Sequence, residues 1–304
     1  MLDYEYWGLG SFSAKTNMAL EELMLKKAIK GVAPFRFWDF SKDSVVLGYA
    51  QATDAVKKTD NSFDVVRRIT GGSHVQTGKN ILAYTFAVPR DGSFGSFEDL
   101  RAYFADIVAK GLVGLGIENI VVDNKASTIM VDNKIVASHA IIWGIESALL
   151  HGLILIDPYD VDKVSERVNL AQRKIGSSVY KEYTALKNLP AVSRLLSSVA
   201  PNLDDQSRSD FLKGTVANSI MKNLTNKFEK KQITDSTISE AFDIVNNKHK
   251  KSSWIENRKP PFTEDEIEKI PGEELNGNLK KNLGYCLFMQ VKNKDFKKMA
   301  QSTE

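Results

Sequence analysis

The sequence predicts an α+β fold, and three observations support that prediction. Strand patterns fill most of the chain up to Asp157, with only two long helical segments among them. Residues 165–250 then have helical periodicity and are rich in Lys, Ser and Asn. Because few strands alternate with helices, a doubly wound parallel sheet is disfavoured. The 304 residues are 42% hydrophobic and 26% charged, which is typical of a folded chain and excludes a disordered or collagen-like protein.

The first predicted helix runs from Thr16 to Ile29, where apolar residues recur at helical spacing. Thr16-Asn17 supplies a capping side chain at its start, and Gly31 is expected to end it. Four strand patterns follow in order. Residues 35–40 alternate as a half-buried strand does, and the other three patterns cover residues 44–49, 64–69 and 81–88.

A second long helix is predicted over residues 97–115, again from the spacing of apolar residues. After a short strand pattern at 120–122, a hairpin is expected around Asp132-Asn133, because Asn and Asp tolerate the positive φ of a two-residue turn. Residues 140–143 and 149–156 predict two further sheet segments.

Charge and cysteine content narrow the classes of protein. The net charge is +3, which is low for a nucleic-acid binder, so no nucleic-acid partner is expected. A single cysteine, Cys286, excludes an intrachain disulfide and a Cys-rich metal site and fits a reducing cytosol. The most apolar stretch, residues 140–156, is interrupted by charge and is short for a bilayer. We therefore expect a cytoplasmic protein with no membrane contact and no bound metal cluster.

Residues 67–75 carry the strongest chemical signal. Arg67 and Arg68 end a strand pattern, and Gly71-Gly72 follows them within a turn. Glycine lets the backbone approach a ligand, and arginine binds oxyanions through two parallel donors, so the segment suits a carboxylate or a phosphate. A plain turn with surface arginines explains the same pattern, and both interpretations stay open here.

Two more segments contain candidate residues. Lys134 directly follows the predicted hairpin turn, where a fixed ammonium would stabilise developing negative charge; a solvated turn lysine is the alternative. His151-Gly152 lies inside an apolar strand pattern, where the ring and a bare backbone patch would border a cavity. A histidine satisfied within the core is the alternative for that pair.

Taken in order, these segments resemble one family, the lipoate–protein ligases of the biotin/lipoate attachment superfamily. The resemblance covers roughly residues 12–262 and rests on the following segments: 17–22 (NMALEE), 36–38 (RFW) with 46–51 (VLGYAQ), 67–72 (RRITGG), 132–138 (DNKIVAS), His151-Gly152, and 254–261, which starts with Trp254 and ends with Pro261.

The resemblance implies a mixed, largely antiparallel sheet flanked by helices, as in the biotin/lipoate ligase-like catalytic domain. It also implies an ATP- and Mg²⁺-dependent reaction in which lipoate becomes lipoyl-AMP and the lipoyl group then passes to a lysine of a carrier protein. By position, Lys134 would be the catalytic lysine. The substrate and the nucleotide would be held by Arg67, Arg68, Gly71, Gly72, Ser73, His74, Val75, Gln76, Ser138 and His151.

The chain departs from the family pattern at a few positions. The family usually has a third glycine at Ser73, a small residue at His74 and a histidine at Thr77, and often an aspartate at Gly78. An Asn-Asp pair is common near Ser127-Thr128. If the segment is extended, His74 and Thr77 point to different faces. An octanoyl or lipoyl transferase of the same fold, which needs a cysteine nucleophile, and a non-catalytic relative are the alternatives to the ligase.

The resemblance also divides the chain. A catalytic domain is expected at residues 1–262, with 165–250 as its helical portion, followed by a tail at 263–304 that is too short for a full accessory domain. Either a separately encoded accessory protein completes the ligase or the tail replaces it; a strand packed on the same domain is the alternative. The expected contact residues of the tail are Tyr285, Leu287, Phe288 and Met289. Within 165–250, one helix stripe is predicted from Phe211, Val216, Ile220, Leu224 and Phe228, and another helix is predicted to open at Ser236-Thr237.

Overall fold

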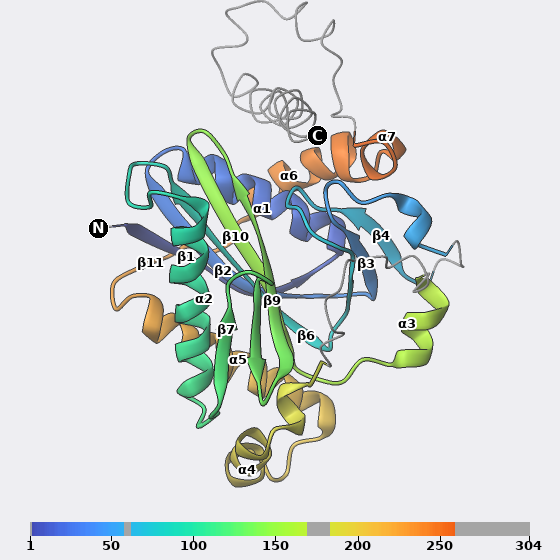
Figure 1. Ribbon diagram of the computed structural model, residues 1–304. Coiled ribbons are helices and arrows are strands. Elements are labelled where there is room, and N and C mark those ends of the chain that lie inside the picture. Colours follow the sequence, from blue (N-terminus) through green and yellow to red (C-terminus); the bar gives the residue numbers. More distant parts are fainter. Residues whose placement is uncertain (1, 58–61, 169–182, 259–304) are drawn as a thin grey trace, which may run out of the picture.

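The computed structural model describes residues 2–57, 62–168 and 183–258 and confirms the α+β fold (Figure 1). An eight-stranded sheet has helices against both faces. Helices α2 and α5 pack on one face within the largest hydrophobic core, and α1 packs on the other face. A separate three-stranded sheet lies beside the main one, in the order β4-β3-β5.

The main sheet is mixed and largely antiparallel, as the resemblance implied. Its strands lie in the order β11-β1-β2-β6-β10-β9-β8-β7. Strand β1 pairs in parallel with β2 and β11, whereas all other neighbours are antiparallel. The strands of both sheets are β1 (Asp3–Phe12), β2 (Val32–Phe40), β3 (Ser44–Leu47), β4 (Asp64–Arg67), β5 (Val75–Thr77), β6 (Ile81–Pro89), β7 (Ile120–Asp123), β8 (Thr128–Val131), β9 (Lys134–Trp143), β10 (Ser147–Leu155) and β11 (Glu229–Lys230).

The helices agree with the predicted positions, with differences at their ends. The cap of α1 is Ser13, whose side chain accepts from the N–H of Thr16, so the helix starts two residues before the predicted Thr16. The helices are α1 (Ala14–Ala28), α2 (Phe97–Val113), α3 (Val161–Arg167), α4 (Pro190–Val199), α5 (Asp205–Leu224), α6 (Asp235–Ile244) and α7 (Ser252–Ile255), with 3₁₀ turns at Thr53–Ala55 and Leu186–Asn188 and a π-helix at Val245–His249.

The predicted hairpin is confirmed by its backbone angles. Asp132 and Asn133 have φ values of 47° and 63°, as a two-residue turn between twisted strands requires. Strand β9 then continues without a break to Trp143, so residues 140–143 belong to the same strand as 134–136. The sequence patterns did not reveal β1 or β5.

Two expectations about burial were wrong. Strand β2 is buried on both faces and not half-buried, because β1 and β6 flank it and helices cover both sides of the sheet; its aromatic residues divide between two cores. The expected apolar stripe in the helical portion is incomplete. Phe211 is 38% exposed, and Phe228 follows the end of α5, where it packs against Phe35.

The predicted division of the chain at residue 262 stays a prediction. Residues 259–304, which include Cys286 and the four expected contact residues of the tail, lie outside the described residues. The described parts of 165–250 are largely helical, with β11 as an additional short strand.

A buried ion cluster attaches the C-terminal helical segment to α1. Oε1 of Glu22 accepts from Nζ of Lys248 at 2.8 Å and from Nε2 of His249 at 2.9 Å. The ammonium of Lys248 also lies 4.1 Å from the ring centroid of Trp254. Burial alone would raise the pKa of Glu22, but the charge of Lys248 and the hydrogen bond to His249 together lower it to about 2. Burial lowers the pKa of His249, although Glu22 acts in the opposite direction.

This cluster predicts a specific loss of stability in acid. A carboxylate whose folded pKa is about 2 and whose ordinary value is 4.5 stabilises the fold above pH 4.5, on the order of 3 kcal/mol, and loses this contribution as pH falls towards 2. The lowered pKa of His249 acts in the same direction below about pH 6.5. We expect the melting temperature to fall between pH 6.5 and 3, and Glu22→Gln to weaken that dependence. A pH dependence unchanged in Glu22→Gln would contradict the assignment.

Candidate functional site

A cavity of about 430 Å³ of empty space, including its mouth, lies between the main sheet and the small sheet. Strands β2, β3, β5, β9 and β10 supply its walls, and α1 contributes Met18. One part of the lining is apolar. Another part is polar and includes Arg68, Ser138 and His151. The lining residues are Met18, Trp38, Phe40, Val46, Arg68, Val75, Thr77, Ser138, His139, Ala140, His151, Gly152 and Leu153.

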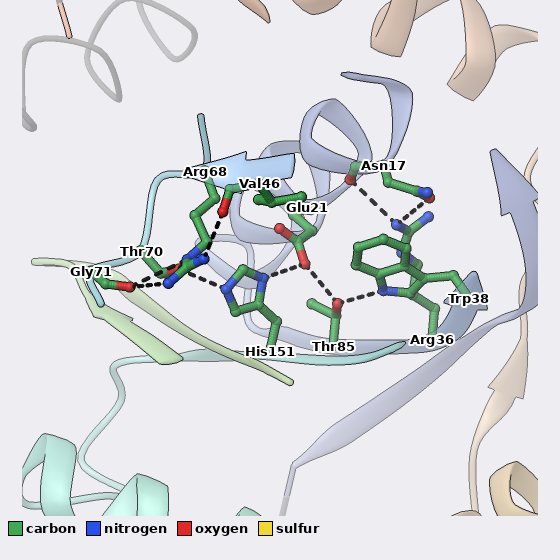
Figure 2. Close-up of polar contacts among 10 residues, drawn as sticks. All are labelled: Asn17, Glu21, Arg36, Trp38, Val46, Arg68, Thr70, Gly71, Thr85 and His151. Carbon is green, nitrogen blue, oxygen red and sulfur yellow. Dashed lines mark hydrogen bonds and ion pairs between the residues drawn. The ribbon is translucent and has the colours of Figure 1, made fainter. Parts of the chain in front are cut away.

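Arg68 uses most of its donors inside the protein. Nη2 donates to the carbonyl oxygen of Gly71 at 2.6 Å, and Nε donates to Oγ1 of Thr70 at 3.0 Å (Figure 2). Nη2 also donates to the carbonyl oxygen of Ser73 at 2.9 Å. Burial lowers the pKa of Arg68 to about 10, whereas the charge of Glu21 acts to raise it. The sequence suggested that this guanidinium binds an oxyanion directly; the structure shows that it lines the cavity and also fixes the conformation of the turn.

The turn offers a different set of donors. Among the described residues, the N–H groups of Gly71, Gly72 and Ser73 have no hydrogen-bond acceptor, while Arg68 holds two of the turn's carbonyls. Gly72 has a φ of +95°, which other L residues rarely adopt. Successive N–H groups in such a turn form a concavity that suits an anion. Of the groups predicted to bind an anion, the backbone N–H groups of the turn are thus the ones without an acceptor among the described residues, and Arg68 lies behind them.

Arg67 does not line the cavity. Its guanidinium donates at 2.7–2.8 Å to four backbone carbonyls, those of Gly48, Tyr49, Gln51 and Ile255. Nε1 of Trp254 donates in return to the carbonyl of Arg67 at 3.1 Å. These contacts attach α7, which contains Trp254, to the end of β4. The last residues of the Trp254 segment, 259–261, lie outside the described part.

Residues 74–77 divide between two directions. Val75 and Thr77 line the cavity. Nδ1 of His74 lies 2.7 Å from Nε2 of Gln51, and Gln76 is buried away from the lining. His74 and Thr77 thus point to different faces, as expected for an extended segment.

Lys134 and Ser138 lie on the same strand but at different depths. Ser138 lines the cavity, whereas Lys134 is exposed at the first residue of β9, outside the lining set. Four residues of regular strand span about 13 Å. Lys134 therefore lies at the end of β9, beside the hairpin turn, and β9 supplies part of the cavity lining.

His151 is held by a buried acid that the sequence analysis did not single out. Its Nδ1 lies 2.7 Å from Oε1 of Glu21, and its Nε2 lies 2.6 Å from Oγ1 of Thr70 (Figure 2). Glu21 has no exposed surface. The available signal was an acidic residue between Leu20 and Leu23 on the apolar face of α1, where a charge has to find a partner.

His139 is a second buried histidine at the cavity, and unlike His151 it was missed by the sequence analysis. Neither ring nitrogen has a hydrogen-bond partner among the described residues. Burial, with a further contribution from the charge of Arg101, lowers the pKa of His139 to about 4, so the ring is neutral at pH 7.

The described ranges contain no group of three or more His, Cys, Asp or Glu side chains that could hold a metal ion. None of the helices in them is long and apolar enough to cross a bilayer.

Comparisons with known proteins agree with this geometry. The protein-family model described as "Lipoyl protein ligase A/B catalytic domain" matches residues 13–200, more than half of the chain. Lipoate–protein ligase 1 of Staphylococcus aureus is 24% identical over 259 residues, which cover 84% of this chain and 73% of that protein.

Two solved structures are similar in fold. A lipoate–protein ligase A bound with ATP superposes with a TM-score of 0.62 at 17% identity, covering 84% of this chain and 98% of that one. A bipartite lipoate protein ligase from Thermoplasma acidophilum, studied with its E2 lipoyl domain, gives a TM-score of 0.63 at 16% identity and covers 84% and 96% of the two chains.

Proposed function

The chain belongs to the lipoyl protein ligase A/B catalytic-domain family, and from that membership we propose that it is an ATP-dependent lipoate–protein ligase. The membership confirms the family resemblance and the expectation of a ligase enzyme. The observation that carries the finer proposal is the cavity itself. An apolar chamber borders Arg68, whose turn presents three N–H groups without acceptors among the described residues.

The proposed reaction has two steps. In the first, a carboxylate oxygen of lipoate attacks the α-phosphorus of ATP, the bond to the β-phosphate oxygen breaks, and pyrophosphate leaves. In the second, a lysine amine of the carrier protein attacks the acyl carbon, loses a proton, and AMP leaves. Both steps place negative charge on carboxyl and phosphoryl oxygens, which fixed donors stabilise.

Each part of the site has a role in this proposal. The apolar lining, including Trp38, Phe40 and Leu153, would hold the lipoyl tail. The N–H groups of Gly71–Ser73 would bind the phosphate, and Lys134 would bring its ammonium to the reacting carboxylate and the α-phosphate. A hydrophobic chamber with a few oriented polar groups is the usual form of a small-molecule site.

Mg²⁺ would come with the nucleotide. Among the described residues, no carboxylate side chain lines the cavity, so these lining residues do not form a resident magnesium site. The phosphates of ATP and water would then be the ligands of the ion.

The acceptor would be a lipoyl domain of a carrier protein, as in the Thermoplasma acidophilum system. The test is to incubate the purified chain with ATP, Mg²⁺, lipoate and an apo lipoyl domain and to measure AMP release and the intact mass of the domain. A lipoyl mass increment with matching AMP supports the ligase. Neither product, in the presence or absence of a cell extract that supplies an accessory protein, would contradict it.

The same assay also tests whether the chain needs a separately encoded accessory protein. Full activity of the purified chain alone would rule out the need for a separately encoded partner. Activity that appears only after the extract is added would support one.

The transferase alternative predicts a covalent acyl-cysteine. Cys286 is the single cysteine of the chain and lies outside the described residues. We expect Cys286→Ser to change acyl transfer less than about threefold, because a ligase passes the acyl group through an adenylate. Loss of transfer, with an acyl adduct on the wild-type chain detected by mass spectrometry, would favour the transferase.

A further inference from the structure

A continuous chain of buried hydrogen bonds runs behind the turn at residues 70–73, the proposed phosphate site (Figure 2). Nε1 of Trp38 donates to Oγ1 of Thr85 at 2.9 Å, and Thr85 donates to Oε1 of Glu21 at 2.9 Å. The same carboxylate oxygen contacts His151, which contacts Thr70, which accepts from Arg68. These residues come from α1, β2, β6, β10 and the turn after β4, so the chain joins elements that are far apart in the sequence.

Donor and acceptor roles along the chain follow from its ends. A carboxylate only accepts, so Nδ1 of His151 carries the hydrogen towards Glu21. In the neutral ring Nε2 is then an acceptor, and the hydroxyl of Thr70 donates to it at 2.6 Å. With its hydrogen used in this way, Oγ1 of Thr70 presents a lone pair to Nε–H of Arg68 at 3.0 Å. The acid therefore sets the tautomer of His151, and the tautomer sets the orientation of the Thr70 hydroxyl.

Glu21 also balances buried positive charge. Burial lowers the pKa of Arg36 to about 9 and that of Arg68 to about 10, and in both cases the charge of Glu21 acts to raise the pKa. Oε2 of Glu21 has no hydrogen-bond partner among the described residues. A fully buried carboxylate with one unpartnered oxygen is costly, so packing alone does not account for it.

We propose that Glu21 is a positioning residue for nucleotide binding. Through His151 and Thr70 it fixes Arg68, and Arg68 in turn holds the carbonyls of Gly71 and Ser73 so that the N–H groups of the turn face the phosphate. The proposal rests on the proposed function for its kinetic consequence. Its structural content, the relay from Glu21 to Arg68, is independent of the reaction.

The kinetic test uses Thr70→Val, which removes the hydroxyl and keeps the shape of the side chain. We expect kcat/KM for ATP in lipoate-dependent AMP formation to fall at least tenfold, while KM for lipoate changes less than threefold. Thr70→Ser should restore wild-type values to within threefold. Thr128→Val is the matched control, because this buried threonine lies outside the cavity lining and its hydroxyl has no partner among the described residues. Equal changes in both KM values would indicate a merely structural role and overturn the proposal.

A second kinetic measurement tests the coupling between Glu21 and Thr70. Glu21→Gln should also lower kcat/KM for ATP, and Glu21→Gln/Thr70→Val should be within threefold of the worse single variant, since both changes interrupt the same chain. Fully multiplicative effects of the two substitutions would overturn the relay.

Nitrogen NMR tests the relay even if the chain releases no AMP. In the wild type, His151 should be protonated at Nδ1 and not at Nε2, and Nε–H of Arg68, assigned with Arg68→Lys, should exchange slowly with solvent. Thr70→Val should speed that exchange at least tenfold. An Nε2–H tautomer or an unchanged exchange rate would overturn the proposal. Absence of AMP with the expected NMR result would instead contradict the proposed function alone.

Discussion

Lys134→Ala is expected to reduce lipoyl-AMP formation by a hundredfold or more while leaving the fold intact. In the proposed reaction Lys134 brings its ammonium to the developing carboxyl and phosphoryl charge, where a cation lowers the barrier by a few kcal/mol, and about 1.4 kcal/mol corresponds to each tenfold in rate. Lys134 is exposed at the start of β9, so its removal should shift the melting temperature by no more than about 2 °C. The measurement is AMP release from ATP and lipoate, together with a thermal melt.

Lys125→Ala is the matched control for this prediction. Lys125 is another exposed lysine at a turn of the same sheet, between β7 and β8, and it contacts the site in no described way. It should retain wild-type activity. A Lys134→Ala variant that forms lipoyl-AMP at a near wild-type rate would contradict the catalytic role of Lys134.

Gly48→Ala is expected to distort the turn at residues 70–73, which is the proposed phosphate site. A Cβ at Gly48 would lie 1.8 Å from the carbonyl oxygen of Gly72 and 2.7 Å from its carbon, both of them backbone atoms that cannot rotate away. The turn must therefore move, and it would carry with it the N–H groups of Gly71–Ser73. We expect KM for ATP to rise at least tenfold and the free energy of unfolding to fall by about 1–3 kcal/mol, as for overpacked sites.

Gly214→Ala controls for the general effect of replacing glycine. A Cβ there would have no neighbour within 4 Å, and the residue lies inside α5, where alanine is favoured by about 1 kcal/mol. Its ATP kinetics should be unchanged and its melting temperature equal or higher. If Gly48→Ala binds ATP as the wild type does, the turn between residues 71 and 73 is not the phosphate site.

The direction of the His74 side chain could be predicted from the local sequence, but its hydrogen-bond partner could not. Alternation along an extended segment was enough to predict that His74 and Thr77 face different ways, and the structure agrees. The contact of His74 with Gln51 could not be predicted, because it depends on how the end of β3 passes the turn. The identity of a side chain's partner is a property of the assembled fold.

The sequence by itself determined most of the helices and strands and the family. Apolar spacing located α2, the Asp132-Asn133 pair located a hairpin whose positive φ angles are confirmed, and the ordered motifs predicted the mixed sheet that the structure shows. The helix and the hairpin depend on neighbours within a few residues, which a sequence displays directly, whereas the mixed sheet was implied by the family resemblance. The parallel strand β1 and the complete burial of β2 were missed, because they depend on which elements lie beside a strand.

Only the tertiary structure decided what each candidate side chain does. Arg67 and Arg68 are adjacent in sequence, yet one donates to Ile255, which is 188 residues away, and the other shapes the turn at the cavity. Glu21 became part of the site through His151, 130 residues along the chain. A long buried side chain must satisfy its polar atoms with whatever carbonyls and hydroxyls surround it, and folding alone brings those groups together.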